Sequence, residues 1–357
     1  MKTYLSAAAA MLVLFASSCK KDNSDCTPAV IHVVESINTA TTWDACHIYH
    51  ITAQVVVKAT LTIEPGTIIK LDDNQTITVT DGKIIADGTA ENPIVFTSWK
   101  DDTQGGDNNL DGSATTPQAG DWKQINLTHS SDNTFNHCKI MYGGKNSTPY
   151  WSVTLAWGDG ANNRLTNSVI ARNFGEAAQS AGAVDMTQSP STTVVTGNTF
   201  YGNFRPIAIS NVISIDESNV FHNPDNANEI NVANGIFVHV YFTSLASIPD
   251  VNFYETEVPF VFASDNSYTL PFPRQINLTI GVVVKFGDSF SLNISNESQL
   301  NNHTATGVYF CSLKNDGRLG DTNGDGNATA AGGTDWDGIW EIPTGNYFAW
   351  GNIENAN

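Results

Sequence analysis

Two acidic segments carry the residues of this chain that are best suited to chemistry. Residues 107–112 read DNNLDG and residues 321–326 read DTNGDG, so both follow the pattern Asp-x-Asn-x-Asp-Gly. Alternating carboxylate and carboxamide side chains before a glycine turn can direct several oxygen atoms at one calcium ion, which takes six to eight such ligands. Further aspartates stand at matching positions around each segment. The predicted calcium ligands are Asp102, Asp107, Asn109, Asp111 and Asp121 in the first segment and Asp316, Asp321, Asn323, Asp325 and Asp335 in the second.

These segments are not EF-hands. The glutamate that closes an EF-hand loop would stand where the chain has Gln118 and Gly332. The all-oxygen ligand set disfavours zinc and copper. An alternative interpretation is a solvated acidic turn, in which Asp and Asn serve the turn geometry alone. Because several carboxylates in one loop repel one another without a cation, we favour calcium, and we expect the ion to order the loop rather than to catalyse a reaction.

The elements that position these segments belong to an internal repeat. From Thr97 onward, residues recur 214 positions later, so that Asp107 matches Asp321 and Trp122 matches Trp336. Upstream, LTIEPGTIIKL at residues 61–71 recurs as LTIGVVVKF at 278–286, with two residues deleted. The pattern predicts two copies of one module, of which the second is partial. In this interpretation Trp122 and Trp336 are core anchors.

A finer period lies within the first module. The segments CKIMYGG, SVIARN, NTFYGN and NVFHNP align at Ile140, Ile170, Phe200 and Phe221. Short apolar runs that end in Gly or Asn and return at this spacing are typical of a β-solenoid, in which each coil adds one strand to each parallel sheet. A β-sandwich is the alternative, but the repeat returns at coil length rather than at hairpin length.

The segments LTIEPGTIIK and DGKIIADGTAENPIVFTS resemble the opening coils of right-handed parallel β-helix proteins of the pectin-lyase-like superfamily. The resemblance covers roughly residues 40–240 and again 250–357. It implies an all-β, right-handed parallel β-helix. The predicted organisation is a signal peptide at 1–18, a tether and N-terminal cap at 19–45, a first β-helix module at 46–240, and a junction with a partial second module at 241–357.

The superfamily includes polysaccharide lyases and glycoside hydrolases, so enzyme activity is one expectation to test. A lyase of the pectate type needs calcium and a basic group, usually Arg. Arg205, in FRPIAI, lacks the second Arg of the lyase element. Pairs such as Asp101 and Asp102 occur without the Gly-His-Gly and Arg-x-Lys motifs of the hydrolases. No catalytic residue is assigned, and we expect a protein that binds rather than cleaves.

Aromatic residues support a binding interpretation. Tyr150, Trp151 and Trp157 are candidates to stack on the rings of an extracellular polysaccharide. A structural or adhesive surface protein without a small ligand is the remaining alternative. The formal charge of −19 argues against nucleic acid as a partner.

The first residues indicate export. MKTYLSAAAAMLVLFASSC has one basic residue, an apolar stretch and small residues, as secretory signals do. Its end resembles the lipobox of bacterial lipoproteins, with Ala16 where Leu is usual, and this implies lipidation of Cys19. The following CKKDNSD resembles the tags of outer-membrane lipoproteins that are exposed at the cell surface. In an oxidising compartment Cys26 and Cys46 form the best candidate disulfide, while Cys138 and Cys311 are expected to be buried thiols.

Overall fold

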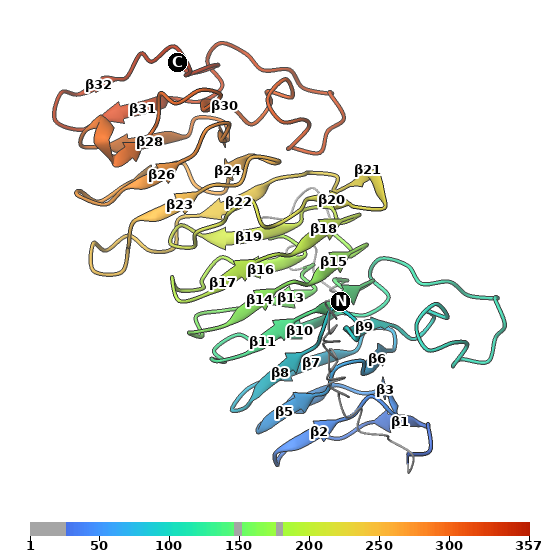
Figure 1. Cartoon of the computed structure of the whole chain (residues 1–357). Coiled ribbons are helices and arrows are strands. Elements are labelled where there is room, and N and C mark those ends of the chain that lie inside the picture. The colour runs from blue at the N-terminus through green and yellow to red at the C-terminus, as the bar shows by residue number, and fades with distance from the viewer. Residues whose placement is uncertain (1–25, 146–151, 176–180) are drawn as a thin grey trace, which may run out of the picture.

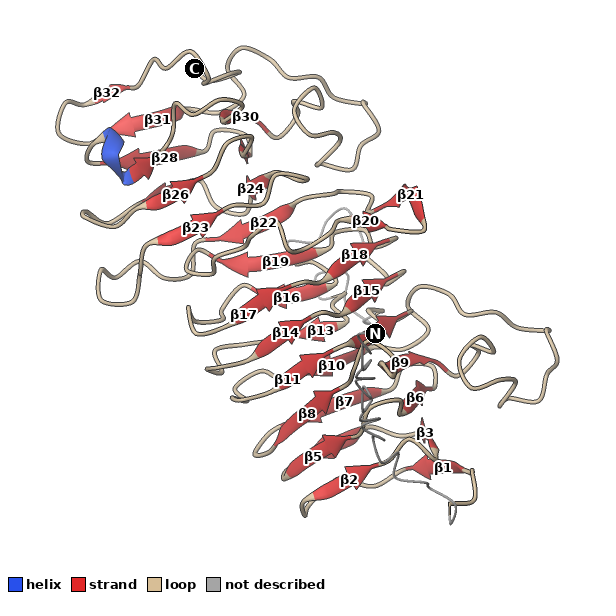
Figure 2. Ribbon diagram, viewed as in Figure 1, coloured by secondary structure: helices blue, strands red, loops and turns tan. Residues whose placement is uncertain are grey.

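The chain folds into an elongated stack of short parallel strands, in which each coil lies on the one before it (Figure 1). This computed structural model describes residues 26–145, 152–175 and 181–357. Strands follow one another along the whole described chain, and one short 3₁₀ helix, η1 (Glu297–Gln299), interrupts them (Figure 2). The architecture is a right-handed parallel β-helix, which confirms the β-solenoid predicted from the repeats and the fold that the resemblance implied. None of the helices in the described part is long and apolar enough to cross a membrane.

Three parallel sheets enclose the first part of the stack. Sheet A contains β1 (Val30–Val33), β3 (Ile48–Ile51), β6 (Ile68–Leu71), β9 (Ile94–Ser98), β12 (Cys138–Met141), β15 (Val169–Ala171) and β18 (Thr199–Tyr201). Sheet C contains β2 (Thr41–Trp43), β5 (Thr60–Ile63), β8 (Lys83–Asp87), β11 (Thr134–Asn136), β14 (Arg164–Thr166) and β17 (Val194–Thr196).

Sheet B runs the length of the stack and joins its two parts. It contains β4 (Val55–Val57), β7 (Thr76–Val79), β10 (Gln124–Asn126), β13 (Leu155–Ala156), β16 (Val184–Met186), β19 (Ile207–Ser210), β22 (Ile236–His239), β24 (Phe260–Phe262), β27 (Val283–Phe286) and β30 (Tyr309–Ser312). Because its ladder crosses residue 240 without a break, the junction predicted there continues the same stack.

The later coils use two other sheets beside sheet B. Sheet D contains β23 (Val251–Phe253), β26 (Ile276–Leu278) and β29 (Leu300–Asn301). Sheet F contains β25 (Ser267–Thr269), β28 (Ser291–Ile294), β31 (Gly338–Glu341) and β32 (Asn346–Tyr347). A separate hairpin of β20 (His222–Asn223) and β21 (Asn226–Ile230) lies beside β18.

The core consists of like side chains stacked coil upon coil. Ile140, Ile170 and Phe200 are partners in register on sheet A, and all three are fully buried. The Phe200 ring stacks on Phe221 at 5.3 Å between centroids. The sequence period of the first module is therefore the coil period, and burial of these columns drives the fold.

Buried asparagines hold the turns between coils. The side-chain amide of Asn173 donates to Oδ1 of Asn203 at 3.0 Å, and that of Asn203 donates to Oδ1 of Asn231 at 2.8 Å. Asn133 and Asn163 make the same contact at another corner of the coil. Each rung satisfies a buried polar group and fixes the register of the next coil.

Candidate metal sites and surface grooves

Two long loops leave the stack, and they contain the acidic segments. Loop 1 (residues 99–123) follows β9 of sheet A, and loop 2 (residues 313–337) follows β30 of sheet B. Figure 1 shows both as excursions from the side of the stack. The strand before each loop thus lies in a different sheet, although the two loop sequences match at a constant offset.

A buried lysine anchors each loop. Lys70 on β6 is fully buried, and its Nζ donates to the carbonyl oxygens of Asp101 at 2.8 Å and Gly106 at 3.0 Å. Lys285 on β27 is equally buried, and its Nζ donates to the carbonyl oxygen of Gly320 at 2.8 Å and to the hydroxyl of Thr322 at 2.9 Å. Burial lowers the pKa of both lysines, to about 8 for Lys285.

The positions of the two lysines change the alignment of residues 61–71 with residues 278–286. Gly66 and Gly281 have nearly the same positive φ, 87° and 90°, and each stands four residues before its lysine. Ile63 is buried, whereas Ile280, its partner in the gapped alignment, is 67% exposed. The two segments therefore correspond without the predicted deletion, because the position of the turn fixes which residues face the core.

Loop 1 brings three of the predicted calcium ligands together. One carboxylate oxygen from each of Asp102, Asp107 and Asp111 lies within 4.8 Å of the others. The carboxylate of Asp107 also accepts from the backbone amides of Asp111 at 3.2 Å and Gly112 at 2.9 Å. Oδ1 of Asp102 and Oδ1 of Asn109 are buried and accept no hydrogen bond from the protein. Such oxygen atoms fit a hard cation.

Loop 2 repeats this arrangement. Asp316, Asp321 and Asp325 lie within the same mutual distance, and Oδ1 of Asp316 is buried without a hydrogen-bond partner. Burial, together with the charges of Asp321 and Asp325, raises the pKa of Asp316. A bound cation would oppose this shift, because its charge stabilises the ionised form of all three carboxylates.

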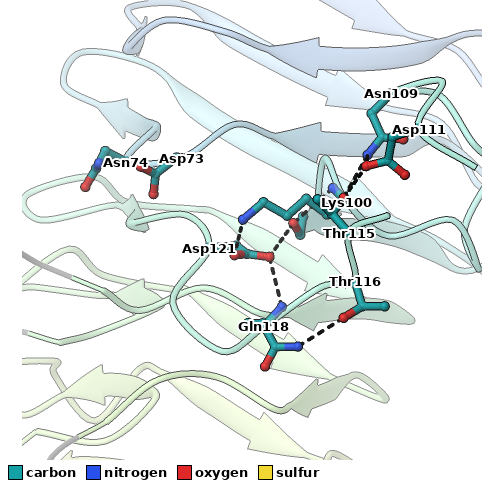
Figure 3. Close-up of polar contacts among 10 residues, drawn as sticks. Asp73, Asn74, Lys100, Asn109, Asp111, Thr115, Thr116, Gln118 and Asp121 are labelled. Atoms are coloured by element: carbon teal, nitrogen blue, oxygen red, sulfur yellow. Dashed lines mark hydrogen bonds and ion pairs between the residues drawn. The ribbon is translucent and has the colours of Figure 1, made fainter. Parts of the chain in front are cut away.

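The two loops also share their internal hydrogen bonds. Asn109 donates to Asp111 at 3.0 Å (Figure 3), and Asn323 donates to Asp325 at 3.1 Å. Thr115 and Thr329 bond the same two aspartates. These contacts hold Asn109 and Asn323 beside the carboxylates of the same loop.

Asp121 and Asp335 lie outside the two acidic groups. The carboxylate of Asp121 accepts from Lys100 Nζ at 2.8 Å, from the Ser98 hydroxyl at 2.7 Å and from the backbone amide of Gln118 at 2.9 Å (Figure 3). Asp335 accepts from the backbone amide of Gly332 at 2.8 Å. Because neither carboxylate belongs to the groups of aspartate oxygens that lie within 4.8 Å of one another, we leave both aspartates out of the proposed ligand set.

A polar groove follows the outer face of sheet B. A hollow of about 320 Å³ over β10, β13 and β16 is lined by residues that include Gln124, Asn126 and Asp185. A second hollow of about 160 Å³ near β22 includes His239 and Asp265. Both hollows share Thr187 and Gln188, which join them along the axis of the stack.

A separate pocket lies on the outer face of sheet A. Its volume is about 320 Å³, and its walls come from loop 1 and from the β20–β21 hairpin. Residues of β12 and β18, among them Lys139 and Tyr201, form its floor. The molecule thus has concave surfaces on two of its sides.

The family comparison agrees with this architecture. Residues 35–152 match the model of the pectate-lyase-like β-helix domain. The match extends from the N-terminal coils past loop 1 and includes β10, β11 and β12. No curated protein and no solved structure matches the chain.

The structure tests some of the roles predicted for the aromatic residues, namely stacking on a ligand or anchoring the core. Trp157 is 2% exposed and packs against Phe135, with 6.2 Å between ring centroids. It lies at the wall of the sheet B groove as a core residue, so the prediction that it stacks on a ligand at the surface is wrong. Tyr150 and Trp151 lie outside the described residues. Trp122 and Trp336 are fully buried, as predicted.

The structure also shows the environment of four cysteines and of Arg205. Cys26 and Cys46 form a disulfide, while Cys138 and Cys311 are buried thiols. Cys19 lies outside the described residues. Arg205 places its guanidinium 4.4 Å from the centroid of Phe237, and burial lowers its pKa to about 10.

Sequence reasoning missed the groove residues and the two anchoring lysines. A signal was present for the lysines, because IIKL and VVKF each carry one charge inside an apolar strand. Gln124, Asp185 and His239 gave no such signal. They come from separate coils, and only the register of sheet B places them on one face.

Proposed function

We propose that this protein is a lipid-anchored cell-surface β-helix that binds an extracellular glycan along sheet B without cleaving it, and that calcium holds its two acidic loops. The observation that carries the proposal is the groove on sheet B. Its lining places polar groups of the β10 coil (Gln124, Asn126 and Thr128) and of the β16 coil (Asp185, Thr187 and Gln188) on either side of the apolar surface of Ala156 and Trp157. Parallel strands stand about 4.8 Å apart, so an extended polymer along the axis would meet hydrogen-bonding groups at every second strand, over β10, β16 and β22.

The calcium part of the proposal rests on the agreement between the two copies of the acidic loop. Each offers three carboxylates and at least one buried oxygen without a partner. Leaving such oxygens unpaired is costly, and a cation with oxygen ligands offsets that cost. The ion then acts by ordering a long loop that has little apolar core of its own.

The location part rests on the N-terminal sequence. A signal peptide that ends directly before Cys19 and the segment CKKDNSD that begins with it support export and lipid anchoring at the outer membrane. The disulfide between Cys26 and Cys46 is consistent with an oxidising compartment. Mass spectrometry of the N-terminal peptide tests this part, because lipidation at Cys19 adds the mass of the acyl chains.

Glycoside hydrolysis is the second candidate function, and Asp185 favours it. This carboxyl lies in the sheet B groove, and burial raises its pKa, as is usual for a general acid. Two hydrogen bonds from Thr187, through its amide at 2.9 Å and its hydroxyl at 2.7 Å, oppose the shift. A lyase is supported less, because the segment FRPIAI around Arg205 lacks the second Arg of the lyase element. A purely structural role at the cell surface is supported less, because it does not account for the groove on sheet B.

One experiment separates these functions. The protein without its signal peptide is incubated with neutral and anionic polysaccharides, with calcium or with a chelator. Binding is measured by calorimetry, and cleavage by new reducing ends and by the ultraviolet absorbance of unsaturated products. We expect binding without product, and we expect the double variant Gln124→Ala, Gln188→Ala to lose at least tenfold in affinity. Product that disappears in Asp185→Asn would overturn the binding proposal in favour of hydrolysis.

A further inference from the structure

The pocket on sheet A is a second concave site, on a different side of the coil from the sheet B groove. Loop 1 contributes Thr103 and Gln104 to one wall, and the β20–β21 hairpin contributes Asn223 and Asp225 to the other. At about 320 Å³ the pocket lies at the lower end of the range for small-molecule sites, about 300–1,000 Å³. All of its lining residues lie in the described part of the chain.

The floor of the pocket combines apolar surface with aromatic rings. Met141 packs outward with Val95 and Ala171 in an apolar cluster that is separate from the core of the stack. Tyr142 and Tyr201 are partly exposed at the edge of this cluster. Such a surface suits the apolar face of a sugar ring, which packs against aromatic side chains while its hydroxyls reach polar groups.

One end of the pocket is a fixed polar network. The guanidinium of Arg172 makes two hydrogen bonds to the carboxylate of Glu229, at 2.7 and 3.1 Å. Asn223 donates to the same carboxylate at 2.7 Å, and Arg172 lies 5.6 Å from the centroid of Tyr201. A bidentate pair of this kind is geometrically restrained, so it orients the groups at that end before a ligand binds.

The remaining charges of the pocket balance one another. Lys139 makes no ion pair with any residue in the described ranges, and Asp225 is exposed on the opposite wall. Arg172 and Glu229 neutralise each other. A strongly acidic or basic ligand therefore gains little from this site. An uncharged polyol gains from both remaining groups, since Lys139 donates hydrogen bonds to hydroxyls and Asp225 accepts them.

We propose that this pocket binds one neutral sugar unit, with its ring against Tyr201 and Met141 and its hydroxyls between Lys139 and Asp225. The site is independent of the sheet B groove, and this proposal shares with the proposed function only the class of ligand. A glycan held at both sites would gain affinity by avidity where its geometry permits both contacts.

The test uses the full chain without its signal peptide and a panel of neutral hexoses, neutral oligosaccharides and uronate oligosaccharides. Ligand-observed nuclear magnetic resonance detects weak binding, and calorimetry measures the affinity. We expect neutral sugars to bind and Asp225→Asn and Lys139→Ala each to weaken them at least fivefold. Both substitutions lie at the surface, and an unchanged melting temperature excludes a folding defect. Arg164→Ala, exposed on sheet C, is the matched control.

The outcomes separate this proposal from the proposed function. If neutral sugars bind and only Gln124→Ala and Gln188→Ala weaken them, the pocket on sheet A has no role and this inference falls, while glycan binding on sheet B stands. If only uronate oligosaccharides respond to Lys139→Ala, the class of ligand assigned to the pocket is wrong. If no sugar binds at all, both proposals are overturned.

Discussion

Lys70 lies beneath Asp101, and its ammonium group donates a 2.8 Å hydrogen bond to the backbone carbonyl of that residue from the face of sheet A. The equivalent contact in loop 2 runs from Lys285 to Gly320 at the same distance. Each loop is therefore attached to the stack at a point next to its carboxylates, and the lysine supplies positive charge there. The attachment and the proposed ion act on the same segment.

Substitution of either lysine by methionine is expected to release its loop. The carbonyl oxygens of Asp101 and Gly106, or that of Gly320, would lose a buried donor, at a cost of about 1–3 kcal/mol for each group left unpaired. We expect faster cleavage by a protease within residues 99–123 for Lys70→Met and within 313–337 for Lys285→Met. Lys83→Met, on sheet C, is the control. Equal cleavage rates in all variants would show that these hydrogen bonds do not hold the loops.

Calcium is expected to raise the melting temperature through both loops. Binding at a hundredfold excess over the dissociation constant stabilises the folded state by about 2.7 kcal/mol per site. Asp107→Asn with Asp111→Asn should remove one site, and Asp321→Asn with Asp325→Asn the other. The matched control, Glu35→Gln with Glu217→Gln, removes two exposed charges elsewhere. If neither calcium nor a chelator changes the melting temperature of the unmodified chain, the proposed sites are contradicted.

Stability is expected to fall as pH rises from about 4.5 to about 7, because of Glu255. Burial, aided by the charges of Glu257 and Asp216, raises the pKa of this carboxyl to about 7 from 4.5. The folded state therefore keeps a proton that the unfolded chain releases, so this contribution is complete below pH 4.5 and lost as pH passes 7. The loss is at most about 3 kcal/mol, at roughly 1.4 kcal/mol per pH unit.

Urea unfolding at pH 5 and pH 7.5 measures this dependence, and Glu255→Gln isolates it. Oε1 of Glu255 accepts from two backbone amides, at 2.8 and 2.7 Å, and a glutamine oxygen can replace it. The variant should lose most of the difference between the two pH values. If the free energy of unfolding changes equally between pH 5 and pH 7.5 in the unmodified chain and in the variant, other groups set the pH dependence. Glu255 is then ionised in the folded state at both pH values.

Removal of the disulfide is expected to loosen the first coil. A closed loop of 20 residues between Cys26 and Cys46 contributes about 3 kcal/mol in the chain-entropy model. The variant Cys26→Ala, Cys46→Ala should exchange its amide hydrogens faster in β1 and β3, whereas β19 and β22 should keep their protection. Uniform acceleration along the whole stack would mean that the coils unfold together.

The periodic part of this fold was accessible from the sequence. Ile140, Ile170 and Phe200 were expected to stack, and they do, because their coils carry no insertion between sheets C and A. GKIIADG and PIVFTS became β8 and β9. The acidic segments were also visible, since their ligands are close in sequence.

What could not be predicted depends on contacts between coils. Asp121 was assigned to the ion because its spacing matched, yet Lys100 and Ser98 take its oxygens. Trp157 was expected at the surface, but it follows β13, a strand of two residues that is too short for its alternation to show which side chains face outward. Asp225 and Thr103 share a pocket only because a hairpin and a loop from different coils flank the same sheet.

The asparagine rungs give this molecule the character of a one-dimensional lattice. Within the sheets, each coil is hydrogen-bonded to the coils above and below it, so we expect disorder to spread by loss of one terminal layer at a time. The disulfide closes the first layer, while residues 352–357 bond back to Phe310 and Trp336 over the last. The resistance of the whole stack to unfolding, including that of the long sheet B, therefore depends on the stability of its first and last coils.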